Sequence, residues 1–387
     1  MVRRRWVALV ALLVGMACAP APSASPASAP AASSAPSAAA AGSAPSGQAA
    51  GTAPTAPAAW PPALQAAIDG ARQEGTLDLV WGGGVLGGSE GVQQLQERIN
   101  QKYGLNLTFN FTLGPAGPAT AARILQEVSA GRTAHTDIHA VSVYPEVKEG
   151  FQSIDWREYV PGLPEETMYF DRRGVAWGTL LPGITYNSQL VPPDKAPRSL
   201  AELPTPQWKG QYAVPPYVVG RGIYALPEYQ GTDRWFPLWR QMVANASGIM
   251  RCGESEHILS GEFPLFAIDC GDYEARSRQR LGQPLAHVIP AEGTVIRYWL
   301  MGVPVTARHP NAAKVFVSYI LSREGQDFVW ETDATDAYRI PGSHIAEVVK
   351  SYEARGVAFH EEYALLDQHP ELVDIEREML TILQQTQ

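Results

Sequence analysis

The sequence has too few basic residues to favour a nucleic-acid partner. Its 387 residues include 30 Lys and Arg against 39 Asp and Glu, which gives a formal net charge of −9. Three of these cations are Arg3, Arg4 and Arg5, and without them the remainder carries −12. A protein that binds DNA or RNA needs a basic surface that displaces counterions from the phosphates. The charge balance therefore argues against nucleic acid, although it does not identify a ligand.

The sequence also lacks an apolar run long enough to cross a bilayer as a mature helix. The run Trp6–Val14 is short and follows the three arginines, which is typical of a secretory signal. The next residues, Gly15-Met16-Ala17-Cys18, resemble the bacterial lipobox, in which the cysteine becomes the lipidated N-terminus. We therefore expect a signal peptide over residues 1–18 and a lipid anchor on Cys18. Because Gly15 replaces the usual leucine, cleavage after Ala17 or Ala19 is the alternative.

Charge and aromatic side chains are absent from the segment that follows. Residues 19–59 are almost all Ala, Pro, Ser, Gly and Thr, and the first aromatic residue after them is Trp60. Such a composition buries too little apolar surface to offset the entropy lost on folding. We therefore predict a disordered Ala/Pro/Ser tether over residues 19–60, which would hold a folded domain near a membrane and let it turn.

Cysteine is scarce, and only Cys252 and Cys270 remain beyond Cys18. An even pair in an exported protein favours a disulfide, and the short loop between the two predicts a stabilisation of about 3 kcal/mol. Two buried free thiols are the alternative, because unpaired cysteines are among the most buried residues.

The rest of the chain, roughly 330 residues, is long enough for two domains. Alternating strand and helix patterns lie on both sides of an apolar crossing at Gly174–Tyr217, and Thr294–Met301 forms a second extended crossing. This rhythm predicts an α/β protein with two lobes, each a mostly parallel sheet flanked by helices. We assign residues 61–180 and 302–387, with the C-terminal helices, to the first lobe and residues 181–301 to the second.

Ligands of open α/β sheets bind beyond the C-terminal ends of the strands. The loops at those positions are Gly82–Ser89, Gly114–Pro118, Ser142–Tyr144, Pro215–Gly222 and Cys270–Tyr273. Arginine in such a place holds carboxylate or phosphate, and tyrosine offers a flat face with a hydroxyl. The residues that we expect to contact the ligand are Ser89, Tyr144, Tyr217, Arg221, Asp272, Tyr273 and Tyr298.

The first glycine loop fits two further motifs. Gly82-x-Gly84-x-x-Gly87 has the form of a dinucleotide fingerprint, but the second strand ends without the acidic residue that would hold a ribose. Gly87-Gly88-Ser89-Glu90-Gly91 matches the nucleophile elbow of esterases, so an exported serine esterase, with partners such as Asp272 and His309, is the alternative function. We prefer a third use, in which backbone N–H groups and Ser89 at a helix N-terminus bind an anionic or polar ligand.

A possible metal motif, His135-x-Asp137-x-His139, lies at the start of a strand. Three ligands in a straight row along one strand do not converge on a single ion. A strand with polar residues at its edge is therefore the better interpretation.

Longer motifs in a consistent order, from about Leu77 to Ser343, carry a more specific resemblance. The first crossing contains Gly183-Ile184-Thr185-Tyr186-Asn187, followed by Pro197-Arg198-Ser199-Leu200-Ala201-Glu202-Leu203 and Trp208-Lys209-Gly210. The later motifs are Ser260-Gly261-Glu262, Glu292-Gly293-Thr294, Gly302-Val303-Pro304-Val305, His309-Pro310-Asn311-Ala312-Ala313-Lys314 and Leu321-Ser322-Arg323-Glu324-Gly325-Gln326. In this combination the chain resembles the bacterial extracellular solute-binding proteins of ABC importers, in particular the ferric-iron-type branch.

The resemblance implies a two-lobed periplasmic-binding fold of type II-like form, whose hinged cleft closes on a small solute or metal ion. It also implies docking on ABC permease subunits in the membrane, an extracytoplasmic location, and neither catalysis nor a cofactor. We expect a monomer, and a solute-sensing domain of the same fold is an alternative. Ferric binders of this branch carry two adjacent tyrosines after the strand that ends here at Asp269. This chain has Asp272 and Tyr273 there, so a ferric site would fall on these two residues with one tyrosine missing.

Overall fold

The structure is a computed structural model that describes residues 59–82, 84–115, 117–141, 146–218 and 220–386. One compact unit, Ala58–Gln387, contains all of them. The expected signal peptide, Cys18 and nearly all of the tether lie outside the described residues, so they stay predictions. Within the described part of the chain, no helix is both long and apolar enough to cross a membrane.

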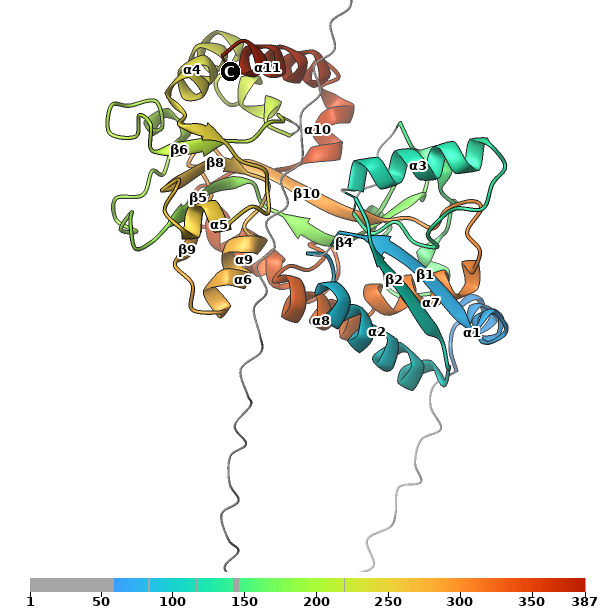
Figure 1. Cartoon of the computed structure of the whole chain (residues 1–387). Helices are drawn as coiled ribbons and strands as arrows, with labels where there is room; N and C mark the ends of the chain where they lie inside the picture. Colours follow the sequence, from blue (N-terminus) through green and yellow to red (C-terminus); the bar gives the residue numbers. More distant parts are fainter. Residues whose placement is uncertain (1–58, 83, 116, 142–145, 219, 387) are drawn as a thin grey trace, which may run out of the picture. The chain divides into compact units, whose positions relative to one another are not determined.

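The first helices and strands build the core of the first lobe. They are α1 (Pro62–Glu74), β1 (Thr76–Trp81), α2 (Gly88–Tyr103), β2 (Thr108–Leu113) and α3 (Gly117–Ser129) (Figure 1). Helix α1 begins at a proline, which the first turn tolerates, and ends at Gly75 in the left-handed conformation with φ 70°. Leu77, Leu79 and Trp81 alternate inward along β1, which pairs in parallel with β2. The glycine after α1 and the two-residue period of β1 are both local features of the sequence.

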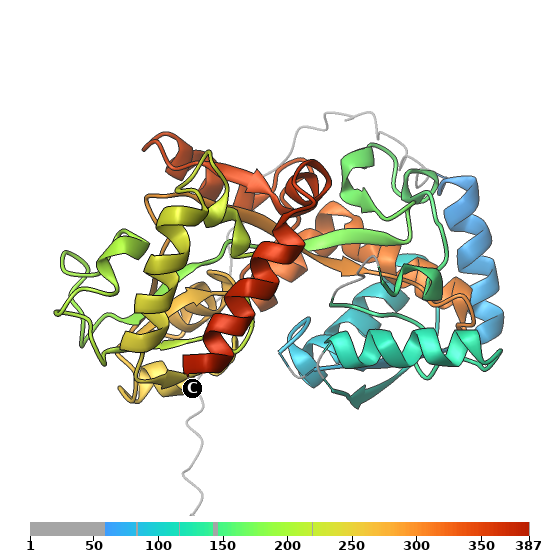
Figure 2. The same ribbon diagram turned by 90° about the horizontal axis from the view of Figure 1, so that it is seen from above.

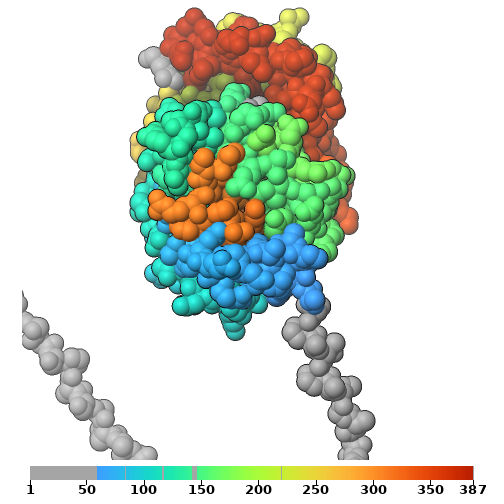
Figure 3. All heavy atoms as spheres, turned by 90° about the vertical axis from the view of Figure 1, so that its right-hand side faces the viewer, coloured from blue at the N-terminus to red at the C-terminus, as the bar shows by residue number. Residues whose placement is uncertain are grey.

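Segments far apart in the sequence meet on the outer side of this core. Helix α7 (Pro310–Leu321) packs against α1, and the Glu74 carboxylate accepts hydrogen bonds from the N–H groups of Asn311 (3.1 Å) and Ala312 (2.7 Å). A carboxylate is favourable there because the first turn of α7 exposes unpaired N–H groups. Figure 3 shows blue α1 beside orange residues of the C-terminal half. Helix α8 (Arg323–Asp333) continues the same core.

A four-stranded sheet carries the chain between the lobes. Its strands are β3 (Met168–Tyr169), β4 (Gly174–Leu180), β10 (Thr294–Met301) and β11 (Phe359–Glu361), in the order β11-β10-β4-β3. Strands β4 and β10 run antiparallel across the middle of the view in Figure 1. Every residue of β4 is buried, as in a strand that is covered on both faces. The chain therefore enters the second lobe after β4 and leaves it along β10.

The second lobe contains a five-stranded sheet in the order β7-β6-β8-β5-β9. The strands are β5 (Gly183–Asn187), β6 (Tyr212–Val214), β7 (Gly248–Ile249), β8 (Leu265–Asp269) and β9 (Leu285–Val288). Strand β6 pairs in parallel with β7 and β8, whereas β5 pairs antiparallel with β8 and β9. The sheet is thus mixed, which differs from the expected mostly parallel sheet. The reason is that β5 continues the crossing from β4 and enters the lobe against the direction of β6 and β8.

Helices cover the second sheet, and short 3₁₀ helices lie in the loops. The α-helices are α4 (Thr232–Asn245), α5 (Glu256–Leu259) and α6 (Tyr273–Arg280). The 3₁₀ helices of the described chain are η1 (Lys148–Gly150), η2 (Trp156–Glu158), η3 (Glu165–Thr167), η4 (Leu200–Glu202) and η5 (Gly222–Ala225).

The chain ends in three helices. They are α9 (His344–Glu353), α10 (Glu362–Gln368) and α11 (Leu372–Thr386). Helix α11 packs against α4 and η5 of the second lobe, beside α4 in Figure 2, whereas the expected division placed it in the first lobe. The reason is its apolar face, whose Met379 is enclosed with Trp235 and Trp239 in the second core. The indole N–H of Trp239 donates to the Met379 carbonyl oxygen at 3.0 Å.

Candidate ligand-binding site

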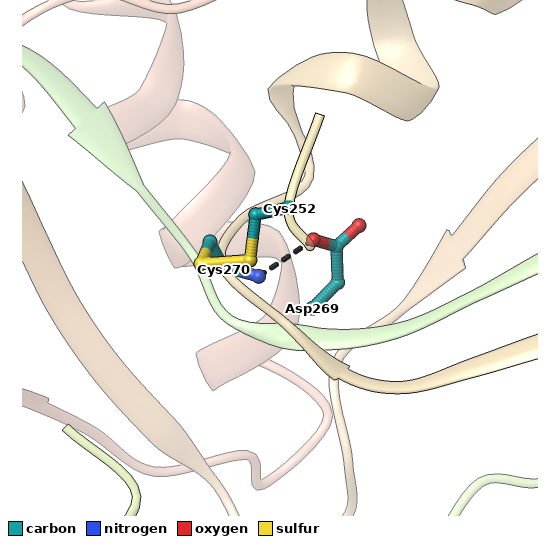
Figure 4. Close-up of side chains that lie close together, drawn as sticks. All are labelled: Cys252, Asp269 and Cys270. Carbon is teal, nitrogen blue, oxygen red and sulfur yellow. Dashed lines mark hydrogen bonds between the residues drawn. A yellow bond between two sulfur atoms is a disulfide. The ribbon is translucent and has the colours of Figure 1, made fainter. Parts of the chain in front are cut away.

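A disulfide lies directly after strand β8. Cys252 and Cys270 are joined, with their Cα atoms 5.8 Å apart, and Figure 4 shows the bridge beside Asp269. The Cys252 N–H donates to the Tyr217 hydroxyl oxygen at 2.8 Å, so the bridge fixes one of the predicted ligand residues. The two sulfurs and a carboxylate oxygen of Asp269 lie within 4.8 Å of one another, close enough to share one ion. Sulfurs bonded to each other are not thiolates, so they do not form a metal site in this state.

Arg221, a predicted ligand residue, is buried and bonded within the protein. Its Nε and Nη2 donate to the carbonyl oxygen of Ile268 at 3.1 and 2.6 Å, and only 1% of the residue is exposed. Ile268 has a left-handed φ of 56°, a conformation that the guanidinium helps to hold. Burial lowers the pKa of Arg221 to about 10, so it stays charged at neutral pH. The guanidinium lies 5.6 Å from the ring centroid of Tyr217, which brings these two predicted residues together.

Asp269 ends strand β8 and has a polar role that the sequence analysis did not assign. Its carboxylate accepts hydrogen bonds from the Thr185 hydroxyl at 2.6 Å and from the Cys270 N–H at 2.6 Å. The Thr185 hydroxyl also lies 2.9 Å from Nδ1 of His287. Burial raises the pKa of Asp269 to about 6, and burial lowers the pKa of His287 to about 3. The end of β8 is therefore a buried polar network that spans β5, β8 and β9.

Asp272 and Tyr273 follow at the start of helix α6. Asp272 forms an ion pair with Arg276 one turn later, and only 5% of the residue is exposed. The Tyr273 ring meets the Trp299 ring edge to face at 4.8 Å, and Trp299 stacks on Trp177 at 5.2 Å. Burial raises the pKa of Tyr273 far above its usual range, and the charge of Asp269 acts in the same direction. Tyr273 is therefore a neutral phenol at neutral pH.

The glycine loop before helix α2 is hydrogen-bonded to a side-chain carboxylate of the protein itself. Leu86 N–H donates to Oδ2 of Asp333 at 2.7 Å, and Gly87 N–H donates to Oδ1 at 2.8 Å. Asp333 is the last residue of α8, and burial raises its pKa to about 6. Ser89 lies one residue inside α2 and is exposed. We expected this loop to bind the anion of a ligand. At the amides of Leu86 and Gly87, the Asp333 carboxylate takes that position instead.

The second glycine loop is held in the same way. The Glu376 carboxylate on α11 accepts hydrogen bonds from the N–H groups of Arg221 and Gly222, both at 3.2 Å. Burial raises the pKa of Glu376 as well. Arg221 and Gly222, at the end of this loop, are therefore positioned by the C-terminal helix, which no local sequence pattern indicated.

Tyr298, another predicted ligand residue, is not part of the group at the end of β8. Tyr298 precedes Trp299 on β10, so its side chain points to the opposite face of the strand, where it packs 5.3 Å from the Tyr169 ring. Tyr298 is buried and belongs to a separate hydrophobic cluster. Tyr144 lies outside the described residues, so its predicted role is untested.

The residues proposed for an esterase do not assemble. Nδ1 of His309 lies 2.7 Å from Oδ2 of Asp137, and its Nε2 lies 3.0 Å from the Thr76 hydroxyl. Asp272 pairs with Arg276, and the described part of the chain shows no hydrogen bond from Ser89 to a histidine. The arrangement therefore does not favour the esterase alternative.

The His135, Asp137 and His139 side chains have separate neighbours. His135 Nδ1 lies 2.7 Å from Glu127, and the His139 ring lies 5.7 Å from the Phe151 ring. The Asp137 carboxylate accepts from the backbone N–H groups of Asp78, Arg308 and His309 at 2.7–2.9 Å. Asp78, Asp137 and His309 lie close enough to share an ion, but Asp137 is already bonded to the protein. It fixes the start of helix α7 against β1.

Surface cavities lie elsewhere on the second lobe. One of about 520 Å³ is lined by Leu226, Gly231, Arg234 and Glu371, and another of about 550 Å³ by Leu190, Trp208 and Pro264. Neither is lined by any of the predicted ligand residues. Tyr217 follows β6, and Tyr273 follows Asp269 at the end of the neighbouring strand β8, so these predicted residues lie at adjacent strand ends and not at these cavities.

Residues 147–351 match the family model described as bacterial extracellular solute-binding protein, and these residues make up more than half of the chain. The chain belongs to this family. The resemblance found in the sequence motifs is thereby confirmed.

Solved structures of related fold support the two-lobed architecture. Iron-bound HitA from Pseudomonas aeruginosa is 16% identical, with a TM-score of 0.60 over 79% of this chain and 99% of that chain. AfuA from Actinobacillus pleuropneumoniae, with fructose-6-phosphate bound, is 18% identical, with a TM-score of 0.55 over 70% and 86%. Apo ferric ion-binding protein A from Pasteurella haemolytica is 14% identical, with a TM-score of 0.57 over 81% and 98%. At these identities the likeness shows the fold alone, which is the predicted periplasmic-binding fold.

A relative from Haemophilus influenzae, described as an uncharacterized protein, is 30% identical over 145 residues. The match covers 35% of this chain and 41% of the relative. The chain thus matches less than half the length of this curated relative, whose description names no activity.

Proposed function

We propose that the protein is the exported solute-binding component of an ABC import system and has no catalytic role. The observation that carries the proposal is the family match over residues 147–351. The fold supports it, because β4 and β10 connect two lobes that each present loops at strand ends. The partners would be a small solute and the permease subunits of the importer.

The expected mechanism is a shift of population between open and closed arrangements of the lobes. A solute that contacts both lobes favours the closed arrangement by the difference between its affinities for the two. The described residues that offer contacts are Tyr217 and Tyr273 of the second lobe, and Tyr273 packs against Trp299 of the crossing strand β10. The permease would then respond to the closed arrangement.

We also propose that Cys18 carries a lipid anchor and that residues 19–60 form the tether. The sequence supports this through the lipobox-like end of the signal peptide and the uncharged low-complexity segment that follows. Mass spectrometry of protein from membranes would show a diacylated N-terminal Cys18. A mature chain that begins with an unmodified Cys18, or with Pro20 after cleavage behind Ala19, would contradict the anchor.

Incubation of the purified full-length protein with a bacterial metabolite extract tests the solute-binding function. After removal of unbound solutes, native mass spectrometry should show the protein with one small molecule bound. The same solute should raise the melting temperature, because it binds only the folded state. Hydrolysis of a p-nitrophenyl ester that is lost in Ser89→Ala, with no captured solute, would support the esterase alternative instead.

A further inference from the structure

Three potential metal ligands lie together at the end of strand β8. They are the sulfurs of Cys252 and Cys270 and a carboxylate oxygen of Asp269, all within 4.8 Å of one another (Figure 4). Asp269 and Cys270 are consecutive residues, whereas Cys252 lies in the loop between β7 and α5. Two separate parts of the second lobe therefore bring the three groups together, so their arrangement belongs to the folded chain.

Reduction of the disulfide would turn the two sulfurs into metal ligands. A trialkylphosphine gives two electrons to the bridge, takes an oxygen atom from water to become the phosphine oxide, and leaves two thiols. Both cysteines are partly exposed, so a small reductant and an ion can reach them. Each thiol loses its proton when it binds a metal ion, because the ligand is the thiolate.

The separation of the two cysteines suits one ion once the bridge is open. A tetrahedral zinc ion holds each sulfur at about 2.3 Å, which places two thiolate sulfurs about 3.8 Å apart. The Cα atoms of Cys252 and Cys270 lie 5.8 Å apart. Rotation of the two side chains about their Cα–Cβ bonds therefore reaches this separation while the backbone stays in place.

Asp269 can bind an ion and keep its present partners. Its Oδ2 accepts from the Thr185 hydroxyl and its Oδ1 accepts from the Cys270 N–H, both at 2.6 Å. Each carboxylate oxygen has two lone pairs, so one lone pair remains on each. The two hydrogen bonds also orient the carboxylate, as partners of metal ligands commonly do. Asp269 is therefore a suitable third ligand, and water takes the fourth position of an open zinc site.

The charges around the three groups favour a divalent cation. Nη2 of Arg221 lies 3.8 Å from Sγ of Cys270, and a nearby cation favours the thiolate form of cysteine. Two thiolates and one carboxylate beside this single guanidinium leave two negative charges, which one divalent ion neutralises. Uncompensated charge is costly in such a partly buried place, so the ion would stabilise the reduced arrangement.

We propose that the reduced chain binds one Zn²⁺ ion through Cys252, Cys270 and Asp269, and that the disulfide excludes this ion. Both states tie the loop of Cys252 to the end of β8, one through a covalent bond and the other through a shared ion. Zn²⁺ is preferred to a hard ion such as Mg²⁺ because two of the three ligands are thiolates. The proposal goes beyond solute binding and does not depend on it.

Zinc titration of the full-length protein tests the proposal, with the phosphine-reduced and the oxidised forms compared. Competition with a chromophoric chelator should show one ion per reduced chain, bound at least about 100-fold more tightly than by the oxidised form. The oxidised form keeps the other group of possible ligands, Asp78, Asp137 and His309, so it reports binding elsewhere. Circular dichroism confirms that the reduced protein is folded. Equal zinc affinity of the two forms would overturn the proposal.

Variants of the reduced protein identify the ligands. Cys252→Ser should lower the zinc affinity at least about 100-fold, and because it keeps Cys18 and Cys270 it also reports any binding by Cys18. Asp269→Asn should lower the affinity about tenfold, whereas Glu262→Gln, which changes an exposed carboxylate of the same lobe, should leave it unchanged. Circular dichroism checks the fold of each variant. Equal affinity of Asp269→Asn and Glu262→Gln would overturn the three-ligand site.

Cobalt gives a spectroscopic readout of the same site. Co²⁺ replaces zinc in tetrahedral sites, and thiolate ligands give it a charge-transfer absorption in the near ultraviolet. This absorption should appear in the reduced protein, be absent from the oxidised protein and weaken in Cys252→Ser. A reduced protein that binds Co²⁺ without this absorption would hold the ion by other residues, which would overturn the proposal.

Discussion

The guanidinium of Arg280 on α6 lies 4.7 Å from the ring centroid of Trp330 on α8, so a cation of the second lobe rests on an aromatic side chain of the first. Arg280 also donates to the carbonyl oxygens of Trp330 and Glu331. Arg276 of the same helix donates to the Ala334 carbonyl oxygen at 2.8 Å. These carbonyls form the C-terminal end of α8, where positive charge is favourable. The lobes are therefore joined by this contact in addition to the crossing strands.

Removal of the Arg280 side chain should loosen this contact. We expect Arg280→Ala to lower the free energy of unfolding by about 1 kcal/mol, from the loss of a cation–π contact and charge-assisted hydrogen bonds. We also expect a broader distribution of interlobe distances in small-angle X-ray scattering. Arg240→Ala is the control, because Arg240 pairs with Glu378 on the exposed surface at 3.6 Å. Identical scattering of the two variants would contradict an interlobe role for Arg280.

The disulfide should stabilise the folded state through the loop that it closes. Replacement of both Cys252 and Cys270 by serine should lower the free energy of unfolding by about 3 kcal/mol, because the unfolded chain gains freedom. Urea unfolding measures the change. A dithiol reductant should destabilise the unchanged protein by a similar amount and leave the double variant unaffected. A reductant effect of the same size in both proteins would show that the bridge is not its cause.

Titration of His287 should make stability fall as the pH falls. The pKa of His287 in the folded protein is about 3, below the usual 6.5. The neutral ring therefore contributes stability above pH 6.5. This contribution is lost as the pH falls from 6.5 toward 3, because the unfolded chain takes up the proton first. His287→Asn keeps a donor near Nδ1 but does not titrate. Between pH 7 and pH 5 the stability of the unchanged protein should therefore drop by up to about 2 kcal/mol relative to the variant. Parallel stability curves for the two proteins, from urea unfolding at each pH, would contradict the assignment.

The buried side of α11 should be needed for the second core. Met379 is fully buried, and its sulfur accepts a hydrogen bond from the Trp235 indole N–H at 3.3 Å. Met379→Ala should lower the free energy of unfolding by about 2–5 kcal/mol through the cavity that it leaves. Arg377→Ala, on the exposed side of the helix, serves as the control in the same denaturation experiment. A cost no greater than that of the control would show that α11 does not complete this core.

Local features of the fold could be predicted from the sequence because each depends on nearby residues. Gly75 and Gly104 end helices in left-handed conformations, which only the backbone freedom of glycine permits cheaply. The alternating residues of β1 follow from the two-residue period of a strand. The order of longer motifs identified the family, and with it the two-lobed fold.

The pairings that shape the candidate site could not be predicted in this way. Asp333 binds the N–H of Leu86 across 247 residues of sequence, and Glu376 binds that of Arg221 across 155. No local pattern indicates which carboxylate will meet which loop, so the loops looked open to a ligand. Tyr298 shows a second limit. The strand period places it opposite Trp299, but only the packed structure shows which of the two faces the site.

The position of α11 also determines when each lobe can fold during synthesis. The tryptophans of α4 are made well over a hundred residues before Met379 covers them. In the same way, the core of the first lobe is complete only after α7 has been made, because α1 packs against α7. Neither lobe is a continuous piece of chain, so contacts between distant residues must form before either core is closed. Such a topology favours slow folding, and most of the polypeptide must be made before either lobe is stable.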